Sequence, residues 1–131
     1  MTEQKVAAPA LYPVLRYQDG RSAIDWLVRV FAFKSDVEVP GAADNIVHAE
    51  LTMGRGKLML SAGRQPDLAN PWSTERAGVY VAVTDVDAHC ARAREGGATI
   101  LMPLANTSYG ARQYTVRDLE GHLWSFGTYQ P

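Results

Sequence analysis

A histidine and a glutamate stand two positions apart in the stretch HAELTMGRGKLMLS (48–61), and both residue types bind divalent metal ions. The stretch is typical of a β-strand, in which residues i and i+2 point to the same face of the sheet. His48 and Glu50 could therefore supply half of a metal site, or could be only the polar face of a sheet. Because the residues beside and between them are apolar, we expect both side chains to lie away from the covered face.

The other histidines and the single cysteine give weaker signals. His89 lies in a predicted helix four residues after Asp85, a spacing typical of a solvent-exposed helix face. His122 follows a predicted hairpin turn, where exposure is the norm. No positioned nucleophile or electrophile accompanies either residue, so no catalytic residue is predicted. Cys90 cannot form an internal disulfide and is expected to be a small buried side chain of a helix.

Length and charge exclude several classes of protein. The chain has 131 residues, which suits one domain with a hydrophobic core. Its 13 Lys and Arg nearly balance its 14 Asp and Glu without a basic cluster, so neither nucleic acid nor an anionic membrane is indicated as a partner. No apolar run approaches the roughly 20 residues that span a bilayer. The stretch MTEQKVAAPA lacks the apolar core of a signal peptide, so a cytoplasmic location is expected.

The chain repeats itself at an offset of 66 residues. Residues 14–33 and 80–99 both predict a strand, an Asp-containing turn and an amphipathic helix. Two strands joined by a glycine-bearing turn follow in each half, and a short strand is expected directly after each helix. The predicted strands are 46–52 and 57–62, 112–118 and 123–128, and the shorter segments near 36–39 and 99–102.

Helix ends can also be located. Ser22 could cap the first helix, and Asp85 or Asp87 could cap the second. Gly96 and Gly97 should end the second helix, because glycine accepts the left-handed conformation. The repeat predicts one α+β domain, residues 1–131, made of two β-α-β-β-β modules at about 11–62 and 78–129. Curved mixed sheets would enclose a cleft, with the helices outside.

This arrangement resembles the vicinal oxygen chelate superfamily, the glyoxalase / bleomycin-resistance / extradiol-dioxygenase group. The resemblance covers the chain from about Leu11 to Tyr129 and points to the glyoxalase-like, PhnB-like branch. It rests on RSAIDWLVRVFAF after the first strand, YVAVTDVDAHCARAREGGA in the middle, and YGARQYTVRDLEGHLWSF near the end.

Metal-dependent members of this superfamily place four His or Glu ligands on the first and last strands of the two modules. The matching positions here are Tyr12, Met59, Val79 and Ser125. Tyrosine coordinates only when deprotonated, valine has no donor, a thioether prefers soft metals and serine is a weak ligand. The resemblance therefore implies a member with no metal and no cofactor, which lacks the Lewis acid of the enzymes. His48 and Glu50 are then interpreted as a polar patch in a ligand cleft.

Strand alternation predicts which side chains line this cleft. Val79 and Val81 are expected to face it, whereas Tyr80 and Ala82 are expected on the covered face. Trp72, in the long loop 63–77, is either a lid over the cleft or an anchor of the loop, and Tyr109 has a similar place in the second half. The predicted ligand-binding residues are Tyr12, Arg16, His48, Glu50, Met59, Trp72, Tyr109, Arg112, Tyr114 and Ser125.

Three functions compete for this cleft. The first is metal-independent binding of a small, aromatic molecule, such as sequestration of an antibiotic or metabolite, as the resemblance implies. The alternative is a glyoxalase-like lyase or isomerase, or a dioxygenase, with unorthodox metal ligands or none. The third is a small structural or regulatory module whose sheet binds another protein. The resemblance also implies a homodimer, which either pairs complete chains or exchanges modules.

Overall fold

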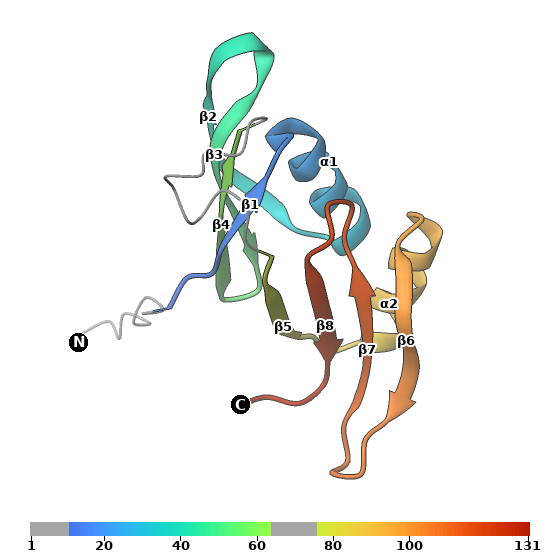
Figure 1. Ribbon diagram of the computed structural model, residues 1–131. Coiled ribbons are helices and arrows are strands. Elements are labelled where there is room, and N and C mark those ends of the chain that lie inside the picture. Colours follow the sequence, from blue (N-terminus) through green and yellow to red (C-terminus); the bar gives the residue numbers. More distant parts are fainter. Residues whose placement is uncertain (1–10, 64–75) are drawn as a thin grey trace, which may run out of the picture.

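The computed structural model describes residues 11–63 and 76–131, and these fold into two halves with the same order of elements (Figure 1). The first half contains β1 (Val14–Tyr17), α1 (Gly20–Phe31), β2 (Lys34–Pro40), the short 3₁₀ helix η1 (Ala42–Asp44), β3 (Ile46–Met53) and β4 (Gly56–Ala62). The second half contains β5 (Gly78–Ala82), α2 (Val86–Glu95), β6 (Thr99–Asn106), β7 (Arg112–Arg117) and β8 (Leu123–Gly127). The predicted pair of β-α-β-β-β modules is confirmed. Neither α1 nor α2 is long and apolar enough to cross a membrane.

Each module forms one mixed four-stranded sheet. Sheet 1 has the strand order β1-β4-β3-β2 and sheet 2 the order β5-β8-β7-β6. The first strand of each module runs parallel to the last, and Val14 is paired with Met59 just as Tyr80 is paired with Ser125. Both members of the second pair lie 66 positions after those of the first (80 − 14 and 125 − 59), which confirms the offset of the repeat.

The helix ends are fixed by short-range hydrogen bonds. Asp19, not Ser22, caps α1: its carboxylate accepts a hydrogen bond from the Ser22 backbone N–H at 3.0 Å. Gly20, the first residue of α1, lies directly against the Ile46 carbonyl, where a Cβ would clash. Asp85, one of the two predicted candidates, caps α2 in the same way by accepting from the Ala88 N–H at 3.0 Å. Gly97 has a φ of +88°, which explains why the helix stops there.

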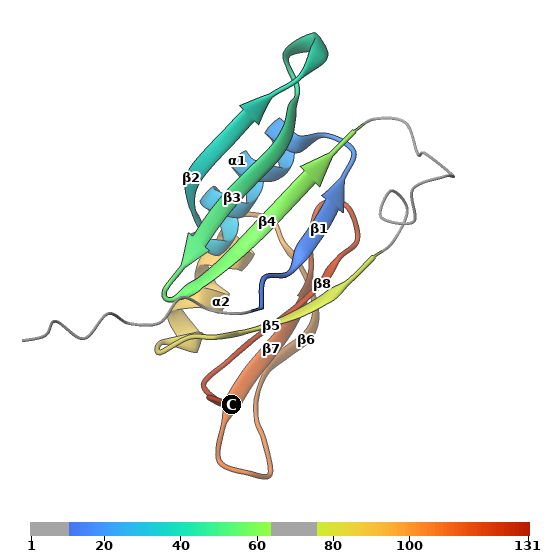
Figure 2. The ribbon, with the colours of Figure 1, turned by 90° about the vertical axis from the view of Figure 1, so that its left-hand side faces the viewer.

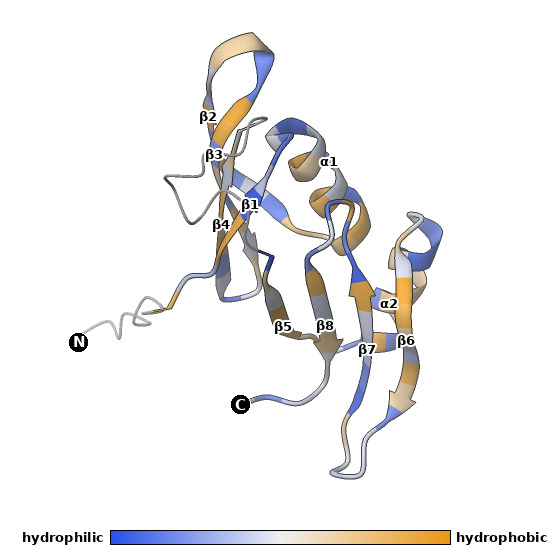
Figure 3. Ribbon diagram, in the orientation of Figure 1, coloured by the Kyte–Doolittle hydropathy of each residue, from blue (hydrophilic) through white to orange (hydrophobic). Residues whose placement is uncertain are grey.

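Each sheet has a face covered by its helix, the covered face, and an opposite open face. Figure 1 shows sheet 1 edge-on beside α1 and sheet 2 face-on with α2 behind it, and Figure 2 shows sheet 1 face-on with α1 behind it. Hydrophobic and hydrophilic residues alternate along the strands, as expected when only one face is buried (Figure 3). The two open faces point in different directions, so one chain alone does not close the expected cleft between them.

The covered faces share one hydrophobic core that spans both modules. The aromatic ring of Phe31, at the end of α1, contacts Trp124 and Phe126 of β8 at centroid distances of 5.3 and 4.8 Å. The helices also cap each other's C-terminal ends. Arg29 donates to the Gly96 carbonyl at 3.2 Å, and Arg92 donates to the Arg29 carbonyl at 3.1 Å. Cys90 is buried in this core, as predicted.

The β7–β8 turn of the second module contacts the end of β1 through buried polar groups. The Asp118 carboxylate accepts hydrogen bonds from the Tyr17 hydroxyl at 2.6 Å and the Trp124 indole N–H at 3.0 Å. Burial, followed by the nearby Asp118 carboxylate, raises the pKa of Tyr17 well above its usual value. The Tyr17 hydroxyl therefore stays protonated and donates. Glu120 accepts from the backbone N–H groups of Gln18 and Asp19 at 2.8 and 3.2 Å.

His122 is fully buried in this contact, so the prediction that it is exposed is wrong. Its Nδ1 accepts from the Ala77 backbone N–H at 3.0 Å, and its Nε2–H donates to the Arg16 carbonyl at 2.8 Å. Its ring packs edge-on against Tyr17 at 4.9 Å. A turn residue is usually exposed, but this turn packs against the other module, and sequence alone does not show that contact.

Candidate functional site

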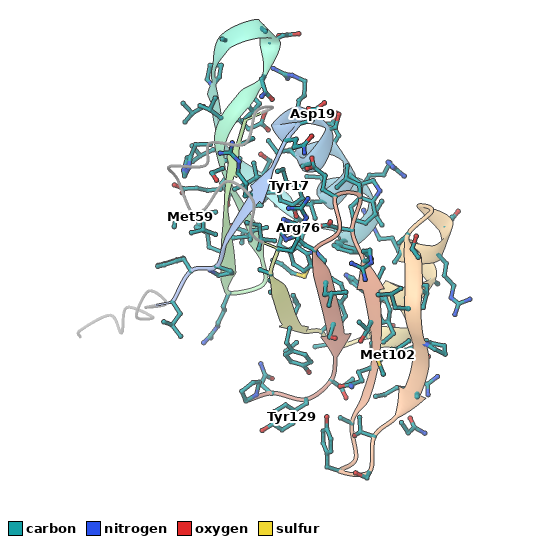
Figure 4. All side chains as sticks on the ribbon, viewed as in Figure 1. Tyr17, Asp19, Met59, Arg76, Met102 and Tyr129 are labelled. Carbon is teal, nitrogen blue, oxygen red and sulfur yellow. The ribbon has the colours of Figure 1, made fainter. Side chains whose placement is uncertain are left out.

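The open face of sheet 1 carries the polar residues predicted for the ligand cleft. Arg16, Ser61 and His48 lie side by side on β1, β4 and β3, and Met59 pairs with Glu50 in the next row. Figure 4 shows Met59 on the side of the sheet away from α1. These side chains are partly exposed, whereas most alternate residues of the same strands are buried. Val47, expected on the covered face from its apolar side chain, is an exception, because it lies near the start of β3 and is 40% exposed. The predicted orientation of β1, β3 and β4 is confirmed.

The polar side chains of β3 and β4 on this face contact one another. His48 Nε2 lies 3.3 Å from Glu50 Oε2, and Lys57 Nζ lies 3.8 Å from Glu50 Oε1. Arg16 donates from one terminal nitrogen to the Gly63 carbonyl at 3.2 Å. Its Nε is buried and has no hydrogen-bond partner in the described part of the chain.

The open face of sheet 2 differs from the prediction because β5 has the opposite orientation. Val79 and Val81 pack against the core, whereas Tyr80 is exposed. Register explains the difference: Tyr80 pairs with Ser125, which is on the open face, and Val79 pairs with the buried Trp124. The strand GVYVA is apolar on both faces, so alternation alone could not orient it. On this face Thr115 and Ser125 share a hydrogen bond of 2.8 Å.

Three tyrosines gather at one end of this open face, and we call Tyr80, Tyr109 and Tyr129 the tyrosine cluster. Tyr80 donates to the Tyr129 carbonyl at 2.6 Å, and the rings of Tyr109 and Tyr129 meet edge to face at 5.8 Å. A Cβ on Gly127 would lie 2.9 Å from the Tyr80 hydroxyl, so glycine lets the Tyr80 side chain lie directly over the strand. The three residues are 37%, 62% and 50% exposed, which is high for aromatic side chains held by one another.

Arg112 and Tyr114 were predicted on the open face, and this placement is wrong. Tyr114 pairs with Phe126 and is completely buried under α2. Arg112 extends toward the same helix and forms an ion pair with Asp87 at 3.1 Å. A tyrosine ring can be buried like any apolar side chain when its hydroxyl has a hydrogen-bond partner. The hydroxyl of Tyr114 was therefore not a sign that the side chain faces the open side. Burial raises the pKa of Tyr114 and keeps that hydroxyl protonated.

The partner of Tyr114 is His89, which was predicted to lie on a solvated helix face and is instead partly buried between the modules. Its Nδ1 accepts from the Tyr114 hydroxyl at 2.6 Å, and its Nε2–H donates to the Phe31 carbonyl at 2.9 Å. Both ring nitrogens are thus satisfied in the neutral form. Burial lowers the pKa of His89, and the nearby Arg92 lowers it further, against the opposing effect of the Phe31 carbonyl.

His89 should make folding stability pH-dependent. Its folded pKa is lowered, so the unfolded chain binds the proton first as the pH falls. The free energy of unfolding should therefore decrease as the pH falls through the unfolded pKa of about 6.5, and the loss should level off below the folded pKa. Urea denaturation between about pH 7.5 and 5.5 should show a smaller slope for His89→Gln than for the wild type. His48→Gln, on an open face, is the control; equal slopes for the wild type and His89→Gln would contradict this prediction.

The four positions that match the superfamily's metal ligands do not converge. Tyr12 precedes β1 and is exposed, Met59 and Ser125 lie on open faces of different sheets, and Val79 packs against the core. Within residues 11–63 and 76–131, no group of three or more His, Cys, Asp or Glu side chains is arranged to hold a metal ion. This donor set does not fit a divalent cation. Trp72, another predicted ligand contact, lies outside the described residues.

Sequence comparison agrees with the fold. The family model described as "Glyoxalase/Bleomycin resistance protein/Dioxygenase superfamily" matches residues 10–126. The chain belongs to this superfamily. The uncharacterized protein Mb0911c of Mycobacterium bovis is 34% identical over 125 residues, which cover 91% of this chain and 82% of that protein.

Three solved structures resemble this chain over almost its whole length. TioX from Micromonospora sp. ML1 is 40% identical, with a TM-score of 0.80 over 92% of this chain and 98% of TioX. TnmS3, an antibiotic binding protein from Streptomyces sp. CB03234, is 21% identical, with a TM-score of 0.70 over 94% and 97% of the two chains. Lactoylglutathione lyase from Agrobacterium tumefaciens is 18% identical, with a TM-score of 0.71 over 94% and 95%. The last two likenesses establish the fold alone.

Tyr80 and Tyr129 were missed by sequence reasoning, and for Tyr80 a signal was present. Arg16 was correctly predicted on the open face of sheet 1, Val14 lies two residues before it on the same face of β1, and the repeat offset of 66 carries Val14 onto Tyr80. Using the repeat rather than local alternation would have oriented β5 correctly. Tyr129 follows the last strand, and its contact with Tyr109 joins two segments whose proximity depends on the fold.

Proposed function

We propose that this superfamily member is a metal-independent binding protein that holds a small aromatic molecule against the open face of sheet 2 without transforming it. The observation that carries the proposal is the exposed tyrosine cluster beside the hydroxyl pair of Ser125 and Thr115. Aromatic rings with a few placed polar groups are typical of small-molecule sites. TnmS3, which has the same fold, is an antibiotic binding protein, so this fold can accommodate the proposed class of function.

The chemistry of this face suits a planar ligand. Stacking against a tyrosine ring adds about 0.5–1.5 kcal/mol beyond burial of apolar area. Met102 pairs with Thr115 across β6 and β7 and is exposed on the same face, where a flexible thioether can adapt to an irregular ligand. Figure 4 shows Met102 on β6 and Tyr129 beyond the end of β8. The Ser125 and Thr115 hydroxyls would orient polar atoms of the ligand.

We propose that the second wall of the site comes from a second copy of this chain, in a cytoplasmic homodimer. The open faces carry exposed apolar side chains, and the outer strands of both sheets have an unpaired edge among the described residues. Such edges and faces are commonly covered by association. The open face of sheet 1 would then add its polar groups, with the residues Tyr12, Arg16, His48, Glu50 and Met59. The dimer either pairs complete chains or exchanges modules.

The proposal is tested by titrating planar aromatic antibiotics and metabolites, with binding measured by calorimetry. For a compound that binds, Tyr80→Ala should weaken the affinity about tenfold, which corresponds to roughly 1.4 kcal/mol. Gly127→Ala should also weaken it, because the new Cβ displaces the Tyr80 side chain. The control is Leu119→Ala, an exposed residue of the β7–β8 turn, which should bind as the wild type does. Wild-type affinity in both Tyr80→Ala and Gly127→Ala would contradict the placement of the site.

The same samples separate binding from catalysis. The ligand should be recovered chemically unchanged, sedimentation equilibrium should give the mass of two chains, and elemental analysis should find no stoichiometric Zn, Ni, Mn or Fe. About one tightly held metal per chain, lost on His48→Ala, would instead support an enzyme of the superfamily.

A further inference from the structure

A crevice with a volume of about 400 Å³ lies between the modules, next to the tyrosine cluster, with which it shares Tyr80. One wall is the β3–β4 turn with the start of β4, residues 53–58, and the other is β5, residues 79–82. Leu11 and Pro13, ahead of β1, lie along it. A volume of this size lies within the range of about 300–1,000 Å³ that is typical of small-molecule sites.

The interior of the crevice is apolar and aromatic. Phe33 and Trp124 line it, with their rings edge to face at 5.5 Å. Val79 and Val81, which turned away from the open face, contribute to its other wall. Among the described residues, β5 pairs only with β8, so alternate backbone N–H and C=O groups on the outer edge of β5 have no partner strand there. These groups can bind polar atoms of a ligand that lies along the strand.

The charged side chains that line the crevice are both cationic. They are Arg55 and Lys57, and no acidic residue is among the described lining residues. Lys57 is partly neutralised, because its Nζ lies 3.5 Å from Asp36 and 3.8 Å from Glu50. Arg55 is exposed and has no ion pair within the described ranges, so its guanidinium is available to an anion. An apolar interior with a cationic mouth is complementary to an amphiphilic anion.

We propose that this crevice is a second binding site, for a small aromatic monoanion of the aryl carboxylate class. The aromatic rings lie against the Phe33–Trp124 floor and the valines of β5, and the carboxylate faces Arg55 and Lys57. Apart from Tyr80, the site uses none of the tyrosine cluster: its floor is formed by Phe33 and Trp124, and its cationic groups come from the β3–β4 turn and the start of β4.

The test compares 2-naphthoate with its uncharged isostere 2-naphthamide by isothermal titration calorimetry at low salt. Naphthoate should bind more tightly than the amide, and added NaCl should weaken only the acid. Arg55→Gln should weaken naphthoate about three- to fivefold, the upper range for one exposed ion pair, and should leave the amide within about twofold. Leu11→Glu, at a side chain that is 87% exposed, should have the same selective effect without disturbing the fold. Arg94→Gln, an exposed arginine of α2 away from the crevice, is the matched control.

Changes in the NMR chemical shifts of backbone amides locate the bound naphthoate. The expected result is a set of chemical-shift changes over residues 53–58 and 79–82 in the wild type that needs about three- to fivefold more naphthoate to reach the same size in Leu11→Glu. Equal affinity for acid and amide, or equal effects of Arg55→Gln and Arg94→Gln, would overturn the proposal. So would loss of naphthoate binding in Tyr129→Ala with no effect of Arg55→Gln, because that pattern assigns the probe to the tyrosine cluster. Failure at the tyrosine cluster alone would overturn only the function proposed above.

Discussion

Replacing Asp118 with alanine is expected to lower the free energy of unfolding by about 3–5 kcal/mol, because a buried acceptor is lost and its donors are left without a partner. The Asp118 carboxylate accepts from the Tyr17 hydroxyl, the Trp124 indole and the backbone N–H groups of Glu120 and His122. The two backbone bonds and the indole bond are each 3.0 Å long. Urea denaturation, followed by circular dichroism, measures the change.

Two variants show which part of this loss belongs to the contact between modules. Tyr17→Phe removes only the hydroxyl that crosses from β1 and should cost about 1–2 kcal/mol. Asp87→Ala removes a mostly exposed carboxylate that forms an ion pair with Arg112, and should cost about 1 kcal/mol or less. Equal destabilisation by Asp118→Ala and Asp87→Ala would show that the buried network does not hold the β7–β8 turn against β1.

The same network links stability to the candidate site. Glu120 accepts from the backbone N–H groups of Gln18 and Asp19, and His122 donates to the Arg16 carbonyl. The β7–β8 turn therefore holds the end of β1 at three successive peptide groups, the last of which carries the N–H of Asp19, the cap of α1. Arg16 projects from this strand onto the open face of sheet 1. A residue of the second module therefore helps to position a proposed ligand contact of the first.

The order of elements was predictable because it depends on signals that are local in the sequence. Glycine-bearing turns separate the hairpin strands, and Gly97 ends α2 at a positive φ where other residues would be strained. The faces of β1, β3 and β4 were also predictable, because their polar and apolar residues alternate and only one face is buried. Leu15, Ala49, Leu58 and Leu60 are all buried, as that alternation requires.

The faces of β5 and β7 were not predictable from alternation. GVYVA is apolar at four of its five positions, so either orientation buries apolar side chains equally well. In β7, Tyr114 has a polar tip and an apolar ring, and its place in the core depends on the acceptor that His89 offers from α2. The error at His89 has the same origin. The partner that makes each residue suitable for burial lies on another element.

The resemblance alone was enough to identify the four positions that match the superfamily's metal ligands. It identified Tyr12, Met59, Val79 and Ser125 as the matching residues, and their chemistry argued against a metal before any geometry was known. The position of Val79 against the core adds a second argument, because that side chain does not face the open side where Ser125 lies. The crevice between the modules could not be found in this way, since it is formed by a turn and an edge strand that no local motif connects.

One residue, Phe31, joins the covered faces of both modules. It is fully buried at the end of α1, next to Trp26 of its own helix at 4.8 Å. On the other side it meets Trp124, Phe126 and His89 of the second module, at ring-centroid distances of 5.3, 4.8 and 6.1 Å. Its carbonyl also accepts the hydrogen bond from His89. Most of the aromatic packing around this ring is therefore contact between modules.

Phe31→Ala should lower the free energy of unfolding by about 3–5 kcal/mol, the range for loss of a buried phenylalanine that leaves a cavity. The measurement is urea denaturation at pH 7.5, where His89 is neutral in both folded and unfolded chains. Phe31→Leu, which keeps most of the apolar volume, should lose less than the alanine variant. Tyr109→Ala is the matched aromatic control, because that ring is mostly exposed and its removal should change stability by about 0.5 kcal/mol or less. If Phe31→Ala unfolded no more easily than Tyr109→Ala, the two modules would be held together by the β7–β8 turn and the helix caps alone.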